Sequence, residues 1–295
     1  MGSPGPGDAR GRPATDRSAS PSPYRLVQPG MRAILWIGAF LTFVAGASLY
    51  LLTERTDRYF AWTIKVPMSA AFLGAFYFTA CVMACASARQ REWSRARVGV
   101  PGVTAFLWLT LIATLLHLSL FHLHAGSGTA RGAAWAWLAI YVLDPIALSI
   151  LWFLQVRVPG RDRPSERPLP AWYRVTLVLE SFLLVLVGIT LFVAPSAAPH
   201  VWPWPLTPLT SRMSAAWLLG LGITAGTAAG ENDWRRIRPA VAGLIALVAF
   251  QSIALMRFGG DVLWSAPIAW AYAAALGVNL VLGVVGAAEQ AGARP

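Results

Sequence analysis

The chain has 295 residues, of which 56% are hydrophobic and only 13% are charged. Soluble domains carry about 25% charged residues, so this composition excludes an ordinary water-soluble core and indicates the lipid bilayer as the solvent. A net charge of +11 would suggest a nucleic-acid partner for a soluble protein. Here the basic residues lie in alternate loops between apolar segments, and we expect no nucleic acid to bind.

The two ends of the chain differ in composition from the rest. The first 28 residues, MGSPGPGDARGRPATDRSASPSPYRLVQ, are rich in Pro, Gly, Ser and Arg. Such a segment has too little apolar surface to fold, which predicts a disordered cytoplasmic tail over residues 1–28. Residues 290–295 are predicted to be a short C-terminal tail.

Eight apolar segments lie between the tails, and none alternates in the way a β-barrel strand would. They cover residues 31–52, 66–88, 99–123, 133–156, 172–194, 211–230, 239–257 and 262–287. Each holds about 20 residues or more, which at about 1.5 Å per residue crosses a hydrocarbon core of roughly 30 Å. The sequence therefore predicts an all-α integral membrane bundle of eight transmembrane helices.

The two halves of the chain resemble each other. Residues 67–116 align with 208–257 without a gap, and the alignment pairs Pro67 with Pro208 and Trp93 with Trp234. We therefore predict two repeats of four helices, residues 29–156 and 172–289, joined by a cytoplasmic linker over 157–171. Since four is an even number, both repeats enter the membrane from the same side, and the repeats are parallel.

The distribution of basic residues predicts the orientation. Eighteen of the 24 Lys and Arg residues lie in the tails and in the loops after the second, fourth and sixth segments, and six lie on the opposite side. The positive-inside rule then places both termini in the cytoplasm.

A Trp- and Arg-containing motif recurs on the predicted cytoplasmic side, as REWSRAR and NDWRRIR. Its aromatic and basic residues are Trp93, Arg95, Arg97, Trp234, Arg236 and Arg238. At headgroup depth such residues anchor a helix end and can bind lipid phosphates. The pattern fits ordinary anchoring as well as a specific anionic lipid or phosphorylated substrate.

Small residues mark one face of the sixth segment. Gly222, Gly226 and Gly230 recur every four residues, which predicts a close-packing face for a neighbouring helix. The aligned positions in the second segment include Cys81 and Cys85, which we interpret as small packing residues rather than metal ligands. The glycine face could also bind another membrane protein or a second copy of the chain.

Polar residues inside the apolar segments are the candidates for function. Asp144 lies near the middle of the fourth segment and Glu180 in the fifth, and Gln251 and Asn279 add weaker polar positions. A charged acid at such depth costs about 2.5–3.5 kcal/mol on insertion scales, so these positions are functional candidates by default. A protonated acid or an interhelical hydrogen bond would explain them equally.

The sequence predicts neither a metal site nor a cofactor. The histidines cluster near one end of the third segment, where His117 is at most a weak metal candidate. The chain contains no phosphate-binding loop, no metalloprotease motif and no nucleophile elbow. An enzymatic activity is therefore uncertain, and we expect it to be absent.

The segments FAWTI and PWPLTPLT are similar to segments of uncharacterised bacterial multi-pass membrane proteins. That resemblance implies a location in the plasma membrane of a bacterial cell and no particular activity. From the residues we favour a transporter or channel for a small solute or proton, with a pathway near the axis between the repeats. The alternatives are a non-catalytic assembly subunit that uses the glycine face, and a membrane enzyme acting on a lipid or quinone.

The predicted topology can be tested with reporter fusions. A reporter at Pro295 should be active as a cytoplasmic fusion, because the C-terminus lies on the side that carries eighteen of the basic residues. A reporter in the 125–131 loop, on the other side, should be active as an external fusion. Finding both reporters in the same compartment would contradict the topology.

Overall fold

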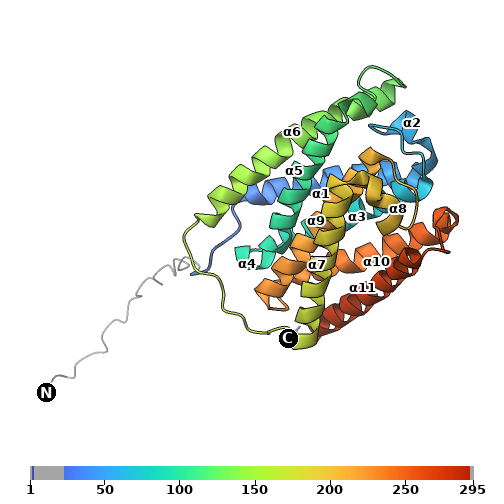
Figure 1. The fold of residues 1–295 in the computed structure, drawn as a ribbon. Coiled ribbons are helices and arrows are strands. Elements are labelled where there is room, and N and C mark those ends of the chain that lie inside the picture. Colours follow the sequence, from blue (N-terminus) through green and yellow to red (C-terminus); the bar gives the residue numbers. More distant parts are fainter. Residues whose placement is uncertain (1, 3–22, 293–295) are drawn as a thin grey trace.

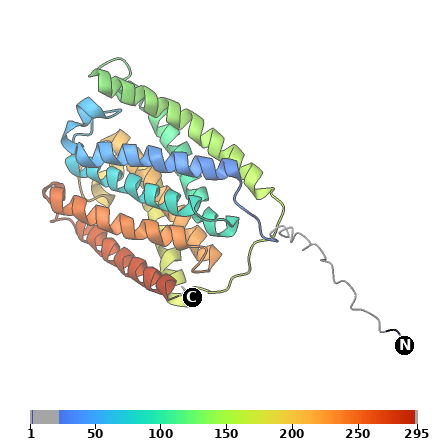
Figure 2. The same cartoon turned by 180° about the vertical axis from the view of Figure 1, so that it is seen from behind.

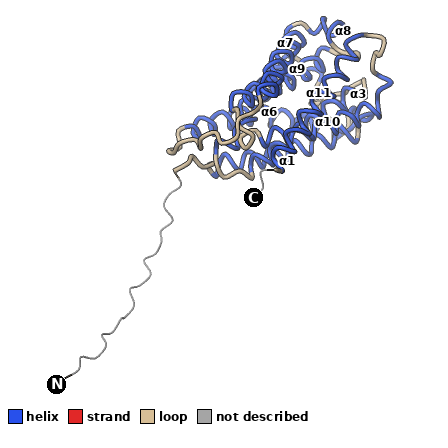
Figure 3. Tube along the Cα trace, turned by 90° about the horizontal axis from the view of Figure 1, so that it is seen from below, coloured by secondary structure: helices blue, strands red, loops and turns tan. Residues whose placement is uncertain are grey.

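The computed structural model describes residue 2 and residues 23–292, which form helices and loops without a strand (Figure 3). The long helices are α1 (Pro29–Leu51), α3 (Pro67–Ala88), α5 (Val100–Leu116), α6 (Gly128–Val156), α7 (Ala171–Val193), α9 (Pro208–Glu231), α10 (Arg238–Phe258) and α11 (Pro267–Ala291). The short ones are α2 (Thr56–Tyr59), α4 (Trp93–Ala96) and α8 (Ala198–Val201). Short 3₁₀ turns cover Thr53–Arg55, Arg97–Gly99, Leu118–Leu120, Pro195–Ala197 and Gly259–Asp261.

Eight helices within the described residues are long and apolar enough to cross a membrane, which confirms the all-α prediction. The chain is an integral membrane protein. Proline sets the start of most of these helices: α1, α3, α5, α9, α10 and α11 each carry it in their first two positions. Proline lacks a backbone N–H, but the first N–H groups of a helix have no partner within the helix, so proline is well tolerated at these positions. The start of α6 is instead capped by Ser127, whose hydroxyl accepts a hydrogen bond from the Ala130 N–H.

Three boundaries differ from the predicted ones by five residues or more, and one of them is the start of α6, at Gly128 rather than at 133. The third spanning helix ends at Leu116 rather than at 123, because Phe121 turns back and packs its ring against Trp62. The last begins at Pro267 rather than at 262, since residues 259–266 form a turn at the end of the bundle. Apolar residues continue through both loops, so hydropathy alone places these boundaries too far out.

The spanning helices form an inner and an outer group. In the inner helices α3, α5, α9 and α10, 44–72% of the residues of the most apolar stretch are buried within the protein. In the outer helices α1, α6, α7 and α11 only 17–22% are buried. Large apolar side chains such as Phe40, Leu143, Phe182 and Val284 cover the outer faces, which are the surfaces that acyl chains solvate.

The two halves of the sequence meet through their inner helices, α3 with α10 and α5 with α9. Helices α6, α1, α3, α10 and α11 lie in succession (Figure 2). On the other side of the bundle α7 packs on α9 and α9 packs on α5. Each half therefore contributes a helix pair, α1 with α3 and α7 with α9, that packs against a helix of the other half.

The contacts between halves are closest at glycine. A Cβ atom added at Gly102 of α5 would lie 2.2 Å from the Gly220 carbonyl oxygen of α9 and 2.2 Å from Thr224 Oγ1. Gly243 of α10 faces Thr79 and Met83 of α3 in the same way, with its nearest contact at 3.3 Å. Gly102 and Gly243 are partners in the sequence alignment of the halves, and so are the residues that they face.

A second pair of contacts follows the same alignment. Gly46 of α1 lies against the Phe78 ring of α3, and Gly188 of α7 lies against the Leu219 side chain of α9. These paired contacts are what two repeats require. The repeat relation and its parallel axis stay predictions.

Aromatic rings fill the middle of the bundle. Phe76 of α3 stacks on Trp217 of α9 with centroids 5.6 Å apart, and Trp217 stacks on Phe106 of α5 at 3.8 Å. The predicted pathway near the central axis is therefore closed by these rings. Free volume lies instead to either side, between inner and outer helices.

The glycine contact between α5 and α9 generates a test. Gly102→Ala should lower the free energy of unfolding in detergent by about 1–3 kcal/mol, because the new methyl group overlaps a backbone carbonyl that cannot move alone. Gly132→Ala is the matched control, since a Cβ atom there meets nothing within 4 Å and alanine is the better helix former. Equal stability of the two variants would contradict the packing.

Candidate functional site

The larger cavity of the protein lies between α7 and α11 and has a volume of about 390 Å³. Side chains of α3, α9 and α10 form its floor, and the loop after α8 covers one end. The lining is mostly apolar. Glu180, Asn279 and Gln251, three of the four polar residues singled out in the sequence, all line it, although they come from three different helices.

Glu180 and Asn279 form the main polar pair of the cavity. The Asn279 side-chain Nδ2 donates hydrogen bonds to Glu180 Oε1 and to the Ala275 carbonyl oxygen, the latter at 2.9 Å. Both amide hydrogens are therefore used. Glu180 Oε2 and Asn279 Oδ1 have no hydrogen-bond partner within the described chain, so both are available to a bound molecule.

Gln251 forms a second polar position on α10. Its Nε2 donates to the Phe72 carbonyl oxygen at 3.2 Å, and its Oε1 accepts from the Tyr272 hydroxyl at 3.1 Å. The side chain is almost fully buried. It ties α3, α10 and α11 together while keeping one edge on the cavity.

The cavity opens sideways between two helices that diverge. Near the C-terminus α7 and α11 meet (Figure 1), where the Tyr173 hydroxyl donates to the Leu282 carbonyl oxygen at 3.1 Å. Towards their other ends the two helices separate and make no extended contact. Leu183, Ala271 and Ala275 line the cavity and are also exposed on the outer surface, so the opening faces the lipid.

Asp144 lies in a smaller cavity of about 130 Å³ between α1 and α6. Gly38 of α1 lies on the opposite wall, and the rings of Trp137, Tyr141 and Tyr77 line the interior. The Asp144 carboxylate has no hydrogen-bond or ion-pair partner within the described residues. The structure thus places Asp144 and Glu180 in separate cavities.

The glycine face of α9 is covered by α7. A Cβ atom at Gly222 would lie 2.9 Å from Val185 Cγ2, and one at Gly226 would lie 2.8 Å from Ser181 Oγ. Gly230, at the helix end, has open space around it. Cys81 and Cys85 are half-buried, free cysteines on α3.

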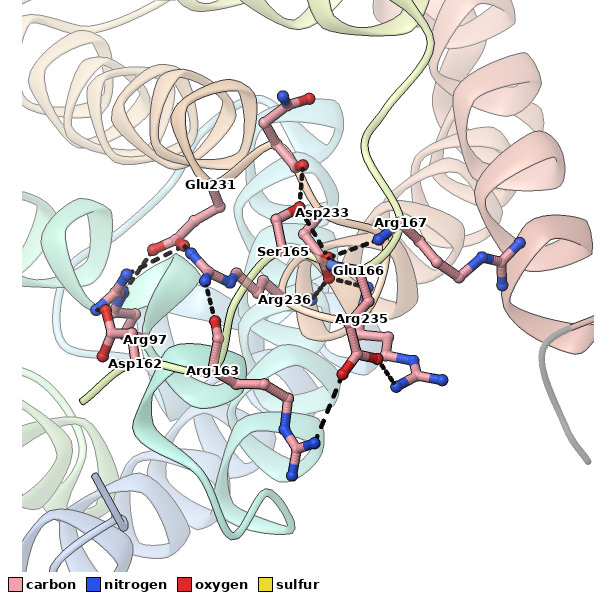
Figure 4. Close-up of polar contacts among 11 residues, drawn as sticks. Arg97, Asp162, Arg163, Ser165, Glu166, Arg167, Glu231, Asp233, Arg235 and Arg236 are labelled. Carbon is pink, nitrogen blue, oxygen red and sulfur yellow. Dashed lines mark hydrogen bonds and ion pairs between the residues drawn. The ribbon is translucent and has the colours of Figure 1, made fainter. Parts of the chain in front are cut away.

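At one end of the bundle the 157–170 linker is bound by a network of ion pairs, which we call the linker network (Figure 4). Arg97 reaches Glu231 through two parallel contacts and Asp162 at 2.6 Å, and Arg236 pairs with Glu231 at 2.9 Å. Arg163 pairs with Glu92 at 2.7 Å. Charges from both halves of the chain and from the linker therefore neutralise one another.

Asp233 is the hydrogen-bond acceptor that holds the linker backbone (Figure 4). Its carboxylate accepts from the N–H groups of Glu166 and Arg167 at 2.8 and 3.0 Å, and from those of Arg235 and Arg236 at 2.8 and 3.2 Å. Burial alone would raise the pKa of Asp233, but these four N–H groups outweigh it, and the pKa lies below its ordinary value.

The two recurring Trp residues occupy matching places in this region. Trp93 and Trp234 are both buried. The backbone N–H of Trp93 donates to the Arg25 carbonyl oxygen at 2.9 Å, and that of Trp234 donates to the Arg167 carbonyl oxygen at 3.0 Å. Arg95 pairs with Glu92 at 3.3 Å, and Arg238 begins α10. Binding of lipid phosphates by these residues and by Arg97 and Arg236 stays a prediction.

The predicted disordered tail falls almost entirely outside the described residues. Residues 23–28, which that prediction included, run in an extended conformation along the linker end of the bundle. Gln155 fixes them: its Nε2 donates to the Leu26 carbonyl oxygen, and its Oε1 accepts from the Gln28 N–H. These two partly buried hydrogen bonds offset the low hydrophobicity of this segment.

His117 lies at the far end of α5 and forms a polar contact rather than a metal site. Its Nε2 accepts a hydrogen bond from Arg212 at 2.7 Å. No group of three His, Cys, Asp or Glu side chains in the described part of the chain could hold a metal ion together.

Several residues of both cavities were not identified from the sequence. Tyr272 and Trp202 line the larger one, and Tyr77 and Tyr141 line the smaller one. A tyrosine in a spanning helix predicts that its hydroxyl has a hydrogen-bond partner, but a single sequence does not predict which residue of another helix is that partner. The acids Asp162 and Asp233 also escaped notice, since isolated loop carboxylates carry no pattern.

Comparison with models of protein families, with curated proteins and with solved structures finds no match to this chain. The geometry of the cavities and the chemistry of their lining are therefore the basis for the function proposed below.

The role of Asp233 can be tested by its pH dependence. Because its folded pKa is lowered, the stabilisation should be present above the ordinary carboxyl pKa of about 3.9 and be lost as the pH falls through the folded value. Asp233→Asn should lower the free energy of unfolding by about 1–3 kcal/mol at pH 7, and this difference should shrink below about pH 4. Asp57→Asn is the control, since that carboxyl is largely exposed, and a loss as large there would refute the assignment.

Proposed function

We propose that this membrane protein is a transporter for a small, mostly apolar solute that carries one or two polar groups. The observation that carries the proposal is the larger cavity, in which an apolar wall surrounds the Glu180–Asn279 pair. Small-molecule sites are typically apolar clefts of about 300–1,000 Å³ with a few placed polar groups. A volume of about 390 Å³ falls within that range.

The size of the cavity bounds the solute. An apolar cavity of about 150 Å³ accepts benzene, so a cavity of about 390 Å³ has room for roughly fifteen non-hydrogen atoms. The free oxygens of Glu180 and Asn279 would bind a donor such as a hydroxyl or amide N–H. A strongly charged solute would find few partners along the rest of the wall.

The lateral opening supports entry from the bilayer. Trp202 and Pro203 cover the cavity at one end, and the Tyr173–Leu282 hydrogen bond closes the other. The open side, between α7 and α11, faces lipid in this conformation. A solute that partitions into the membrane would reach the polar pair without crossing an aqueous pore, and the stacked rings at the centre leave no such pore along the axis.

The assembly alternative has less support. That interpretation depended on a glycine face free to bind another chain, and α7 of the same chain covers Gly222 and Gly226. A membrane enzyme would need reactive groups near one another, and the two intramembrane acids lie in separate cavities.

Transport can be tested with N-acetylphenylalaninamide, a neutral amide that fits the size limit given above, as the radiolabelled probe. Efflux from vesicles containing the purified full chain should exceed efflux from protein-free vesicles. Glu180→Leu should reduce the protein-dependent rate at least about tenfold, because a charge-assisted hydrogen bond contributes roughly 1.5–3 kcal/mol.

The matched control is Thr190→Leu on the same helix. Its hydroxyl bonds only to the Leu186 carbonyl oxygen and does not line the cavity, so this variant should retain the wild-type rate. Equal efflux by wild type and Glu180→Leu, or no protein-dependent efflux at all, would count against the proposal.

A further inference from the structure

The smaller cavity between α1 and α6 is chemically different from the larger one. Its lining includes one acidic side chain, Asp144, and no Lys, Arg or His among the described residues that form it. Glu180 has a hydrogen-bonding amide beside it, whereas Asp144 has no such partner in the described chain. An intramembrane carboxylate that lacks a protein partner is costly unless a ligand or a proton supplies one.

The other polar groups of this cavity are hydroxyls with free lone pairs. Thr42 donates its hydrogen to the Gly38 and Ala39 carbonyl oxygens, at 2.7 and 3.1 Å, and its oxygen also contacts the Cys81 thiol, which leaves one lone pair to accept. The hydroxyls of Tyr77 and Tyr141 lie 2.6 Å apart and share one hydrogen bond. Around Asp144 the cavity therefore offers the carboxylate and several hydroxyl lone pairs, beside one unshared tyrosine O–H, and these acceptors suit a ligand that carries several donors.

Aromatic rings surround the acceptors. Trp137 and Tyr141 lie with their centroids 4.3 Å apart, and Tyr77 lies 4.9 Å from Trp217. All four rings line the cavity. Rings attract cations through their negative faces, more strongly where water is excluded. Acidic and aromatic groups together favour a cation over a neutral molecule or an anion.

The volume limits the size of that cation. At about 130 Å³ the cavity is slightly smaller than one that holds benzene, which leaves room for about five or six non-hydrogen atoms. Gly38 enlarges it, because a Cβ atom at this position would meet nothing within 4 Å.

We propose that the cavity between α1 and α6 is a binding site for a small organic cation with N–H donors, such as a primary ammonium group. Asp144 supplies the countercharge, Thr42 and the tyrosine hydroxyls accept the remaining N–H bonds, and the aromatic rings enclose the ligand. The site is separate from the Glu180–Asn279 cavity and does not depend on the transport function proposed for it.

The test is equilibrium binding of radiolabelled methylammonium to the purified full chain in lipid nanodiscs. Wild type should bind it saturably. Asp144→Asn keeps the size of the side chain but removes the charge, and should weaken binding at least about tenfold. Gly38→Leu should weaken binding by a similar factor, because its side chain fills the cavity.

Gly277→Leu is the matched control. It places the same side chain on an outer helix where a Cβ atom also meets nothing within 4 Å, outside both cavities, and should bind methylammonium as wild type does. Absence of saturable binding by wild type, or unchanged binding by Asp144→Asn, would overturn the inference. Efflux of N-acetylphenylalaninamide from vesicles tests the transport proposal separately, so the two can fail independently.

Discussion

Close approach of helix backbones at small residues is the constraint on which both cavities depend. Within the bilayer, apolar side chains gain little by leaving lipid for protein, so helix association depends on tight packing and hydrogen bonds. Gly102 and Gly220 bring α5 against α9, and Gly188 and Gly222 bring α7 against α9. With α7 held there, and α11 held on α10, the space between α7 and α11 is left open.

The same reasoning applies to α1 and α6 on the other side. Gly46 brings α1 close to α3, while α6 packs mainly on α5. At the linker end a Cβ atom at Gly30 would lie 3.0 Å from the Leu151 side chain, so α1 and α6 are close there and the cavity lies further along. The linker network then ties the segments at that end together, because Arg97 of the first half pairs with Glu231 of the second half and with Asp162 of the linker. Each cavity is therefore closed near the network, and the larger one is open towards the lipid.

The fold was largely predictable from the sequence, and the site only in part. Hydropathy over about 20 residues locates a spanning helix whatever its neighbours, which is why all eight were predicted. Glu180 and Asn279 were found for a related reason, since polar atoms deep in the membrane require partners. Glu180 and Asn279 are hydrogen-bonded to each other because of how α7 and α11 are placed. That placement cannot be predicted from a single sequence. The spacing of Gly222 and Gly226 predicts close packing, but it does not tell which helix packs there, and the structure shows that it is α7. The sequence also predicts a pathway at the centre of the bundle, where the rings of Phe76 and Trp217 stack instead.

The central claim is that α7 and α11 enclose a cavity that is open to lipid and has Glu180 and Asn279 on its wall. An experimental density map of the full chain in nanodiscs made with native lipid would test it most directly. We expect α7 and α11 to diverge away from the Tyr173–Leu282 contact, with non-protein density between them in contact with the Glu180 carboxyl. A map in which α7 and α11 pack side by side along their length, with Glu180 facing the acyl chains, would contradict the account.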